Sequence, residues 1–331
     1  MKAITFDAPG EPSVLKLTTV DAPQLKPHEI RIKMKSAGVN RADCTQREGN
    51  YPPPAGASPI LGLECCGTVQ EIGAEVPAGS FKVGERVMAL LSGGGYAEEV
   101  CIDAGCVLHA PEALSDHEAG GLMEATLTAY LNIFEIGGAR SGQMVLIHGG
   151  GSGVGTQAIA LCKAQGIRTL VTAGSDEKVQ QCLKHGATWA FNYKTEDWAG
   201  NVKLSAKPAG VHVVLDCVGA PYLAKNLDCL APDGCIVYIS ALAGAIVKEL
   251  DLWVLMRKRL RLIGSTMRSR SVAFKAALVR KFAEDFKTEL RRGELRPVVD
   301  KVYPLESAES AHARMQAGRN FGKIILTTTL L

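Results

Sequence analysis

The chain has 331 residues, of which 47% are hydrophobic and 21% are charged, and its formal net charge is +3. This composition is typical of a soluble globular protein, and the length suggests roughly two domains. So small a net charge argues against nucleic acid or a membrane surface as the main partner.

Neither end of the chain shows a targeting signal. The first residues, MKAITFDAPGEPSV, lack the sustained apolar region of a signal peptide. The last residues, NFGKIILTTTLL, contain no peroxisomal or prenylation signal. No apolar run reaches the ~18 residues that a membrane helix needs. We therefore expect a cytoplasmic protein with no membrane partner.

Residues 1–125 are predicted to be mostly β. EIRIKMKSAGV alternates apolar and polar residues as a strand does, and GTVQEIG and VGERVMALL are expected to be two further strands. NYPPPAGASPILG contains four prolines, which remove hydrogen-bond donors and restrict φ. This segment is therefore expected to be a surface loop.

Residues 126–264 alternate between short apolar runs and helix-like segments. The runs are MVLIHG, RTLVTAG, TWAFNY, VHVVLDCVG, GCIVYIS and RLIGST. Short strands that are apolar on both faces are typical of a parallel sheet covered by helices on both sides. The region is therefore predicted to be a doubly wound α/β domain.

Residues 265–331 return to an irregular pattern. SVAFKAALVRKFAEDFKTELRRGEL is predicted to be one amphipathic helix, and VVDKVYPL and GKIILTT are predicted to be strands. We interpret this region as a return segment that packs on the first domain and completes it.

Five glycines gather between the first strand and the first helix of the alternating region. At such a junction, backbone N–H groups can approach a pyrophosphate, and the helix N-terminus attracts its charge. The spacing departs from G-x-G-x-x-G, but its place between a strand and a helix favours a dinucleotide site. The alternative is a tight turn without a ligand. The candidate binding residues are Gly150, Gly151, Ser152, Gly153, Val154 and Gly155.

The end of the second apolar strand favours NADPH over NADH. An NAD site usually has a carboxylate there, which binds the ribose hydroxyl, but this strand ends in Ala173-Gly174-Ser175 and is followed by Lys178. A hydroxyl and an ammonium would attract a 2′-phosphate, whereas Asp176 argues the other way. Ser175 also suits a helix N-cap. Tyr193 is either a neighbour of the adenosine phosphate or a half-buried strand-end tyrosine.

Several motifs together resemble those of the medium-chain dehydrogenase/reductases, in their zinc-free, zeta-crystallin-like quinone oxidoreductase branch. They are NRADCTQREGNYPPP, LGLECCGTV, MALLSGGGYAEEV, LIHGGGSGVGTQAI, LVTAGS and NFGKIIL. The resemblance covers essentially the whole chain. It implies a GroES-like β-barrel catalytic domain (1–125, completed by 265–331), a Rossmann domain (126–264), a cofactor between them, and a homodimer or homotetramer.

The resemblance also implies that no metal is bound. The zinc-bearing relatives have a cysteine ligand at the position of Asn40 and a histidine ligand at the position of Leu63, and their four-cysteine lobe is missing here. Glu64 and Glu124 do not make a tetrahedral site of nitrogen and sulfur ligands. Glu64 is alternatively a buried carboxylate that anchors backbone or an arginine.

The cysteines add no sign of a metal site. The chain has ten cysteines but no C-x-x-C pair, so their spacing predicts neither structural zinc nor a disulfide framework. We interpret most of them as small buried hydrophobic residues in a reducing compartment. Cys44 is the candidate for an accessible thiol.

Without a Lewis acid, the chain lacks the usual means of polarising an alcohol or simple carbonyl. A quinone is itself a strong electrophile, and correct positioning over the nicotinamide can supply much of the acceleration. The sequence therefore favours metal-free reduction of quinones by NADPH. The alternatives are reduction of enone or enal double bonds, and a non-catalytic NADPH-binding role as a crystallin or RNA-binding protein.

Three candidate catalytic residues lie in the N-terminal half. The resemblance implies that Tyr51 lies over the nicotinamide and the acceptor; the alternative is a packing residue of its loop. Asn40 is a candidate donor to a developing oxyanion or to the cofactor carboxamide, or else a backbone cap. Asp43 is expected to orient Arg41 or local backbone rather than to transfer protons.

The resemblance implies further cofactor contacts at Tyr51, Thr126, Cys217, Val218, Gly219, Ile239, Ser240, Arg268, Ser269, Asn320 and Lys323. His148, at the end of the first apolar strand of the Rossmann region, is interpreted as a hydrogen-bonded core or cofactor-side histidine rather than a catalytic one. The basic run 257–261 is interpreted as a solvated helix end or an interface edge.

Overall fold

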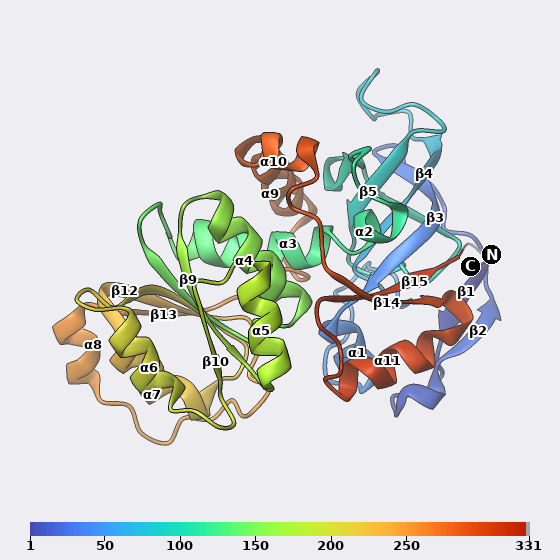
Figure 1. The fold of residues 1–331 in the computed structure, drawn as a ribbon. Helices are drawn as coiled ribbons and strands as arrows, with labels where there is room; N and C mark the ends of the chain where they lie inside the picture. Colours follow the sequence, from blue (N-terminus) through green and yellow to red (C-terminus); the bar gives the residue numbers. More distant parts are fainter. Residues whose placement is uncertain (329–331) are drawn as a thin grey trace. The chain divides into compact units, whose positions relative to one another are not determined.

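The computed structural model describes residues 1–328 (Figure 1). The chain forms two compact units. Unit 1 comprises Met1–Leu127 together with the chain from Met267 onward, and unit 2 comprises Thr128–Thr266. The expected boundaries after residues 125 and 264 each lie two residues before these divisions.

Unit 1 is built on a seven-stranded sheet. Its strands are β3 (Glu29–Val39), β4 (Glu64–Ile72), β5 (Arg86–Leu90), β6 (Glu99–Asp103), β7 (Val107–His109), β14 (Val299–Pro304) and β15 (Lys323–Thr327). The strand order is β14-β15-β3-β4-β5-β7, and β6 also pairs with β3. A separate antiparallel pair consists of β1 (Lys2–Thr5) and β2 (Lys16–Thr19).

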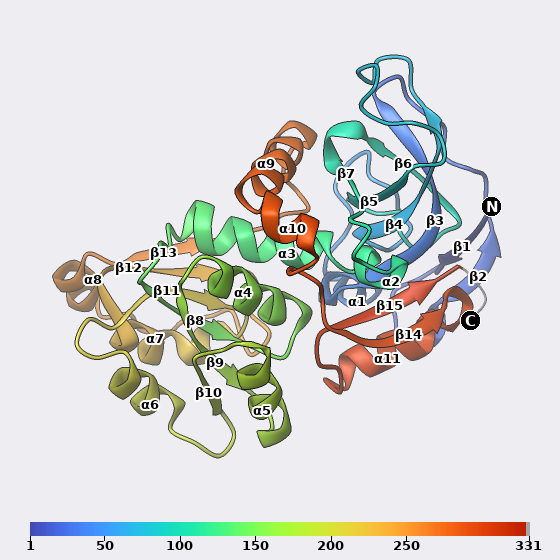
Figure 2. The ribbon, with the colours of Figure 1, turned by 45° about the horizontal axis from the view of Figure 1, so that its top comes forward.

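Strand β3 shows why the alternating sequence forms a sheet. Side chains on successive residues of a strand point to opposite faces, and Ile30, Ile32 and Met34 all enter the core of unit 1. The C-terminal strands join the same sheet, because β15 pairs antiparallel with β3 and β14 pairs parallel with β15. The return segment therefore lies beside the strands of the first 125 residues (Figure 2).

Short helices cover the sheet of unit 1. They are α1 (Arg41–Arg47), α2 (Asp116–Gly120), α9 (Val272–Asp285), α10 (Lys287–Arg292) and α11 (Ala308–Gln316), with 3-10 turns η1 (Pro12–Val14), η2 (Ala104–Cys106) and η5 (Leu305–Ser307). Helix α3 (Met123–Tyr130) runs across the division between the units.

The single helix predicted over 271–295 is wrong, because α9 and α10 are separated at Phe286. This residue has φ −121° and ψ 26°, outside the α-helical region. An α-helix has 3.6 residues per turn, so side chains spaced four residues apart are each rotated by about 40° relative to the one before. In one straight helix, apolar residues at this spacing would gradually turn away from the core. Because the helix is interrupted at Phe286, the apolar side chains at this spacing all remain buried. They are Leu278, Phe282, Phe286 and Leu290.

Unit 2 is a six-stranded sheet in which every pair of neighbouring strands is parallel. Its strands are β8 (Met144–His148), β9 (Arg168–Ala173), β10 (Trp189–Asn192), β11 (Val211–Asp216), β12 (Leu230–Tyr238) and β13 (Arg261–Gly264). The order β10-β9-β8-β11-β12-β13 reverses between β8 and β11. This order confirms the predicted doubly wound sheet, in which ligands bind outside the carboxyl ends of the strands at the reversal.

The connections of unit 2 are mostly helical. They are the π-helical turn η3 (Leu131–Ile136), α4 (Gly153–Ala164), α5 (Asp176–His185), α6 (Trp198–Ser205), η4 (Ala220–Tyr222), α7 (Leu223–Cys229) and α8 (Leu252–Lys258). Helices α6 and α7 cover one sheet face, where they share a core with Leu146, Leu170 and Val214.

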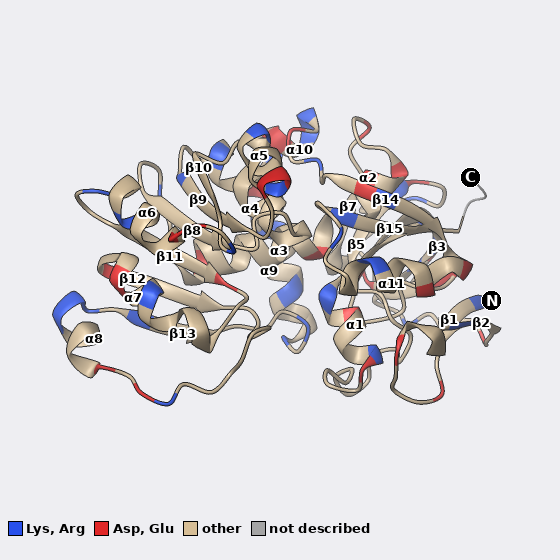
Figure 3. Cartoon of the chain, turned by 60° about the horizontal axis from the view of Figure 1, so that its bottom comes forward, with Lys and Arg blue, Asp and Glu red and all other residues tan. Residues whose placement is uncertain are grey.

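Charged residues of both signs are interspersed along the chain in each unit (Figure 3). Within residues 1–328, every helix is too short or too polar to pass through a bilayer. The basic run that ends α8 makes its polar contacts within unit 2. Lys258 donates to the carbonyls of Leu227, Asp228 and Leu230, and Arg259 pairs with Asp233.

Candidate functional site

The glycine loop lies between β8 and α4, at the point where the strand order reverses. Gly149 has φ +73°, which favours glycine. A side chain on Gly155 would collide with the carbonyl oxygen of Gly149, so this glycine allows the helix to start close to the strand. The Ser152 hydroxyl accepts a hydrogen bond from Gly155 N–H at 2.9 Å and caps α4.

This loop fits the pyrophosphate of a dinucleotide. The N–H groups of Gly153 and Val154 lie in the first turn of α4, where a helix supplies no backbone acceptor. The positive end of the twelve-residue helix dipole reinforces them. The loop can therefore bind an anion through its backbone without a basic side chain.

The tip of β9 brings together three residues expected at a 2′-phosphate. Ser175 caps α5, because its hydroxyl accepts a hydrogen bond from Lys178 N–H at 3.3 Å. A side chain on Gly174 would lie 2.7 Å from the Tyr193 hydroxyl, so Tyr193 comes close to the tip. Asp176 is the carboxylate near this tip that would favour NAD. Its Oδ1 accepts a 2.6 Å hydrogen bond from the amide of Asn192.

The loop after β11 lies beside the glycine loop. A side chain on Gly149 would come 3.3 Å from Cys217 Sγ. Asp216 holds this loop, because its Oδ1 accepts hydrogen bonds from the N–H groups of Val218, at 2.5 Å, and Gly219, at 3.0 Å. Ile239 follows at the end of β12, and its N–H donates to the carbonyl of Asp216 at 2.9 Å.

His148 is a hydrogen-bonded core residue. Its Nδ1 lies 2.9 Å from the Thr172 hydroxyl, and its Nε2 lies 2.8 Å from Asn226 Oδ1. The Asn226 amide donates to Asp216 Oδ2 at 2.6 Å. The Asn226 oxygen therefore accepts a proton from Nε2, and Nδ1 accepts from Thr172. Burial lowers the pKa of His148, so the ring is neutral and positions its neighbours.

In unit 1, Asn40 belongs to a buried ionic cluster. Lys323 Nζ lies 2.5 Å from Glu64 Oε1, 2.6 Å from Asn40 Oδ1 and 3.1 Å from the Val39 carbonyl. The Asn40 amide donates to Glu64 Oε1 at 2.9 Å and to the Gly38 carbonyl at 3.3 Å. The Lys323 ammonium is therefore used inside unit 1, and the expectation that it contacts the cofactor is not supported by this geometry.

Two further expectations change with this cluster. The Asn40 amide protons are already donated, so Asn40 is a positioning residue rather than a donor to an oxyanion. Glu64 does anchor backbone, since its Oε2 accepts from Glu124 N–H at 2.9 Å, but its cationic partner is Lys323 and not an arginine.

Asp43 anchors backbone rather than Arg41. Its carboxylate accepts hydrogen bonds from the N–H groups of Asn40 and Gly62, at 2.8 and 3.0 Å, and from the Tyr96 hydroxyl at 3.1 Å. Burial raises the pKa of Asp43 to about 6, although these donors act in the opposite direction. Arg41 instead donates to the Met315 carbonyl, so the pairing expected for Arg41 is wrong.

Tyr51 lies against Arg268. The guanidinium carbon is 5.5 Å from the centre of the Tyr51 ring, and Nη1 donates to the Tyr51 carbonyl at 3.3 Å. Arg268 Nη2 and the Thr126 hydroxyl are among the buried polar atoms of unit 1 that have no hydrogen-bond partner. Both residues were expected at the cofactor, and a bound polar ligand would satisfy these atoms.

The remaining cofactor candidates lie outside the helices and strands. Asn320 is buried, and its amide donates to the Gly322 carbonyl at 2.9 Å. Ser269 lies in the segment that precedes α9, and Ser240 follows the end of β12. The Glu124 side chain is half-buried. Its pKa is raised to about 8, mainly by burial and in addition by the nearby Glu64 carboxylate.

No metal-binding group is seen in the described part of the chain. Among residues 1–328, no three His, Cys, Asp or Glu side chains cluster as a metal site would require. Leu63 is buried in the interior of unit 1. All ten cysteines are free, but an accessible Cys44 is not found, because its thiol is buried and its pKa is raised to about 12.

Several structurally important residues were missed from the sequence. Asp216 had a usable signal, since a carboxylate directly follows the apolar run of β11. No sequence signal pointed to Asn226, because its hydrogen-bond partners lie in β8 and β11 and not next to it in the chain. The same holds for Ser92 and Lys275, which meet across 183 residues.

Comparisons with known proteins match both units. Residues 26–112 match the "Alcohol dehydrogenase GroES-like domain" family, and residues 153–284 match the "Zinc-binding dehydrogenase" family. A quinone oxidoreductase of Rattus norvegicus is 30% identical over 329 residues, which is 98% of this chain and 97% of the relative.

Solved structures agree with these matches. The Escherichia coli quinone oxidoreductase complexed with NADPH has a TM-score of 0.85 and 28% identity, with 99% of this chain and 100% of that chain covered. An NAD-dependent alcohol dehydrogenase has a TM-score of 0.86 and 29% identity with the same coverage.

Proposed function

Because the chain belongs to the medium-chain dehydrogenase/reductase superfamily, with quinone oxidoreductases among its relatives, we propose that this oxidoreductase reduces quinones with NADPH and without a bound metal. The observation that carries the proposal is the glycine loop of unit 2. Its free first-turn amides lie at the reversal of the strand order, where a doubly wound sheet binds dinucleotides.

The tip of β9 supports NADPH rather than NADH. Ser175, Lys178 and Tyr193 offer two hydroxyls and an ammonium to a 2′-phosphate. The Asp176 carboxylate, which would bind a free ribose hydroxyl, is held by the Asn192 amide. A charge-assisted contact to phosphate is among the stronger hydrogen bonds, so one ammonium can discriminate between the two cofactors.

The residues of unit 1 support a conjugated acceptor. Bound NADPH supplies a hydride, and a quinone that takes up this hydride together with a proton from solvent becomes a hydroquinone. The Tyr51 ring offers a wall for a flat acceptor, and Arg268 stacks behind it. Asn40, Asp43 and Lys323 hold the surrounding backbone in place. The zinc-ligand positions Asn40 and Leu63 lack the side chains that a catalytic zinc requires.

A turnover assay tests this proposal. A simple ortho-quinone is offered with NADPH or NADH at equal concentration, and we expect kcat/KM to be at least about tenfold higher with NADPH. Treatment with a chelator should leave turnover unchanged. Stoichiometric zinc that is required for turnover would contradict the proposal.

The same assay separates the alternative functions. A panel of enones and enals replaces the quinone, and faster turnover of these substrates would assign the protein to double-bond reduction. Tight NADPH binding without turnover of any acceptor would instead indicate a non-catalytic NADPH-binding protein.

We also propose a cytoplasmic homodimer formed through unit 2. Strand β13 lies at the edge of its sheet, where backbone groups are free to pair with another strand. The segment before it exposes large apolar side chains, including Ile246 (85% exposed) and Trp253 (68% exposed). Contiguous exposed apolar surface is typical of a protein interface, and a second copy would cover it by twofold symmetry.

A further inference from the structure

We propose that a groove within unit 1 binds the carboxylate of an acidic acceptor through Lys275 and Arg268. This inference rests on the proposed function, since it names the class of quinone that the protein prefers. Such a substrate carries its carboxylate on an apolar chain, so that the ring lies at Tyr51 and the acid lies at the two cations.

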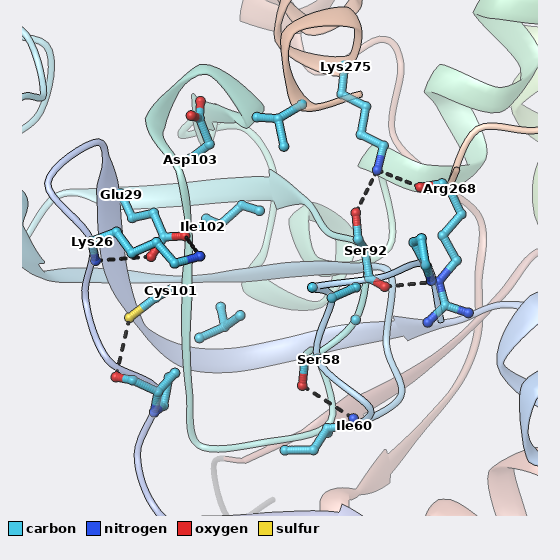
Figure 4. A pocket seen from close by; sticks show the side chains of 18 of the residues that line it. Lys26, Glu29, Ser58, Ile60, Ser92, Cys101, Ile102, Asp103, Arg268 and Lys275 are labelled. Carbon is cyan, nitrogen blue, oxygen red and sulfur yellow. Dashed lines mark hydrogen bonds and ion pairs between the residues drawn. The ribbon is translucent and has the colours of Figure 1, made fainter. Parts of the chain in front are cut away.

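The groove has a volume of about 620 Å³, and all of its lining residues belong to unit 1. This volume is within the usual range for small-molecule sites. It runs from the segment before β3, past the loop after Tyr51 and along β6, to the start of α9 (Figure 4). Ile60, Val100 and Ile102 also line the groove and give it an apolar wall.

Two buried cations lie at one end of the groove. The Lys275 ammonium donates to the Ser92 hydroxyl at 2.6 Å and to the Arg268 carbonyl at 2.7 Å. Arg268 Nε donates to the Ser92 carbonyl at 2.9 Å. Lys275 and Arg268 are each only 3% exposed. Figure 4 shows both side chains converging on Ser92.

Neither cation has an anionic partner. Among the described residues, no carboxylate oxygen lies within 4.0 Å of Lys275 Nζ or of the Arg268 guanidinium. A buried charge without a counter-charge is costly. Burial lowers the pKa of both groups, so a bound anion would stabilise their charged forms.

None of the nearby acids that the structure describes forms an ion pair with either cation. Asp43 acts on Arg268 from a distance, while its carboxylate accepts hydrogen bonds from backbone and from Tyr96. Asp103 lines the groove near α9, and its Oδ1 accepts from Gly105 N–H at 2.8 Å.

Glu124 acts on both cations, but its pKa of about 8 leaves it mostly protonated at neutral pH. The Cys106 thiol, which also acts on Lys275, has its pKa raised to about 12 by burial. The two cations at the α9 end of the groove are therefore hydrogen-bonded but lack an ion-pair partner among the residues described.

Towards the opposite end of the groove, two lining carboxylates have ion-pair partners. Glu29 pairs with Lys26 at 3.3 Å, and Glu99 pairs with Arg31 at 3.4 Å. Lys275 and Arg268, which lack such partners, lie near α9, whose N-terminal turn also lines the groove and adds positive partial charge.

Arg268 connects the anion site with the proposed acceptor site. Its guanidinium stacks on Tyr51, and its Nη2 is buried without a hydrogen-bond partner. An acceptor whose ring lies on Tyr51 therefore has the Arg268 guanidinium beside it, and Arg268 lines the groove together with Lys275. A carboxylate on a short apolar chain satisfies both requirements in one molecule.

The test compares a 1,4-benzoquinone that carries a carboxyalkyl chain with its methyl ester. The chain separates the acid from the ring, so the two quinones have similar intrinsic reactivity. We expect the kcat/KM of the acid to exceed that of the ester at least tenfold. Lys275→Met should bring this ratio close to one, whereas Lys281→Met, an equal charge change on the exposed side of α9, should leave it unchanged.

A binding measurement keeps the test independent of turnover. Hexanoate should raise the melting temperature of the full chain, hexanamide should not, and Lys275→Met should abolish the difference. Equal use of acid and ester together with no hexanoate effect would overturn the inference and leave the proposed function intact. If neither quinone is reduced, the proposed function fails, and the hexanoate shift alone decides whether the anion site exists.

Discussion

Lys178 is the residue on which the cofactor preference depends most. Lys178→Ala removes an ammonium from the first turn of α5 but keeps the Ser175 cap, because Ser175 accepts from the backbone of residue 178. We expect the ratio of kcat/KM for NADPH to that for NADH to fall about tenfold, mainly through a higher KM for NADPH.

Two comparisons control this experiment. Turnover with NADH serves as the internal reference, and Lys184→Ala makes the same change in the last turn of α5. A variant at Lys178 that retained the full preference would exclude its contact with the phosphate.

Glu124 links stability to pH in a direction opposite to that of a paired carboxylate. Its pKa rises from 4.5 to about 8 on folding, mainly because of burial. Above about pH 4.5 the unfolded chain releases this proton while the folded chain keeps it, so wild-type stability falls as pH rises towards 8. Glu124→Gln does not titrate and should escape this loss.

The difference in unfolding free energy between Glu124→Gln and wild type should therefore grow between about pH 5 and 8. Its slope can reach about 1.4 kcal/mol per pH unit, and it should level off above pH 8. Urea titrations at several pH values measure it, with Glu75→Gln as the exposed control. A difference that does not change with pH would contradict the raised pKa.

At the scale of elements, Lys323 ties the return strand to the rest of unit 1. It begins β15, yet its partners lie at the end of β3 and the start of β4. Lys323→Met would leave the Glu64 carboxylate buried without a cation. Breaking a buried pair in this way costs about 3–5 kcal/mol.

Denaturant unfolding should therefore show a large loss of stability for Lys323→Met. Arg259→Ala is the matched control, because it breaks the exposed pair with Asp233, and exposed pairs contribute little. Equal effects of the two variants would show that Lys323 does not carry the stability assigned to it.

At the scale of the whole molecule, the exposed apolar segment before β13 predicts assembly. Trp253→Glu places a charge where two copies are proposed to meet, so it should convert a dimer into a monomer. Sedimentation velocity measures the mass, and circular dichroism should show an unchanged fold, because Trp253 is exposed on α8. A wild-type protein that is already monomeric would contradict the proposed interface.

The sequence by itself determined the pattern of elements. The two-residue alternation of β3, the six strands of unit 2 and the glycine loop before α4 were all predicted. Each of these signals is local, because strand periodicity and the glycine requirement of a tight strand-to-helix turn act over a few neighbouring residues.

Only the tertiary structure decided which side chains meet. Lys323 and Asn40 are 283 residues apart, and Lys275 and Ser92 are 183 apart, so no local pattern relates them. Their contacts engage the Asn40 amide, bury Lys323 and leave Lys275 and Arg268 without an ion-pair partner. The physical reason is that the free energy of a buried polar group depends on the partners that folding brings to it, and the sequence around that group does not contain those partners.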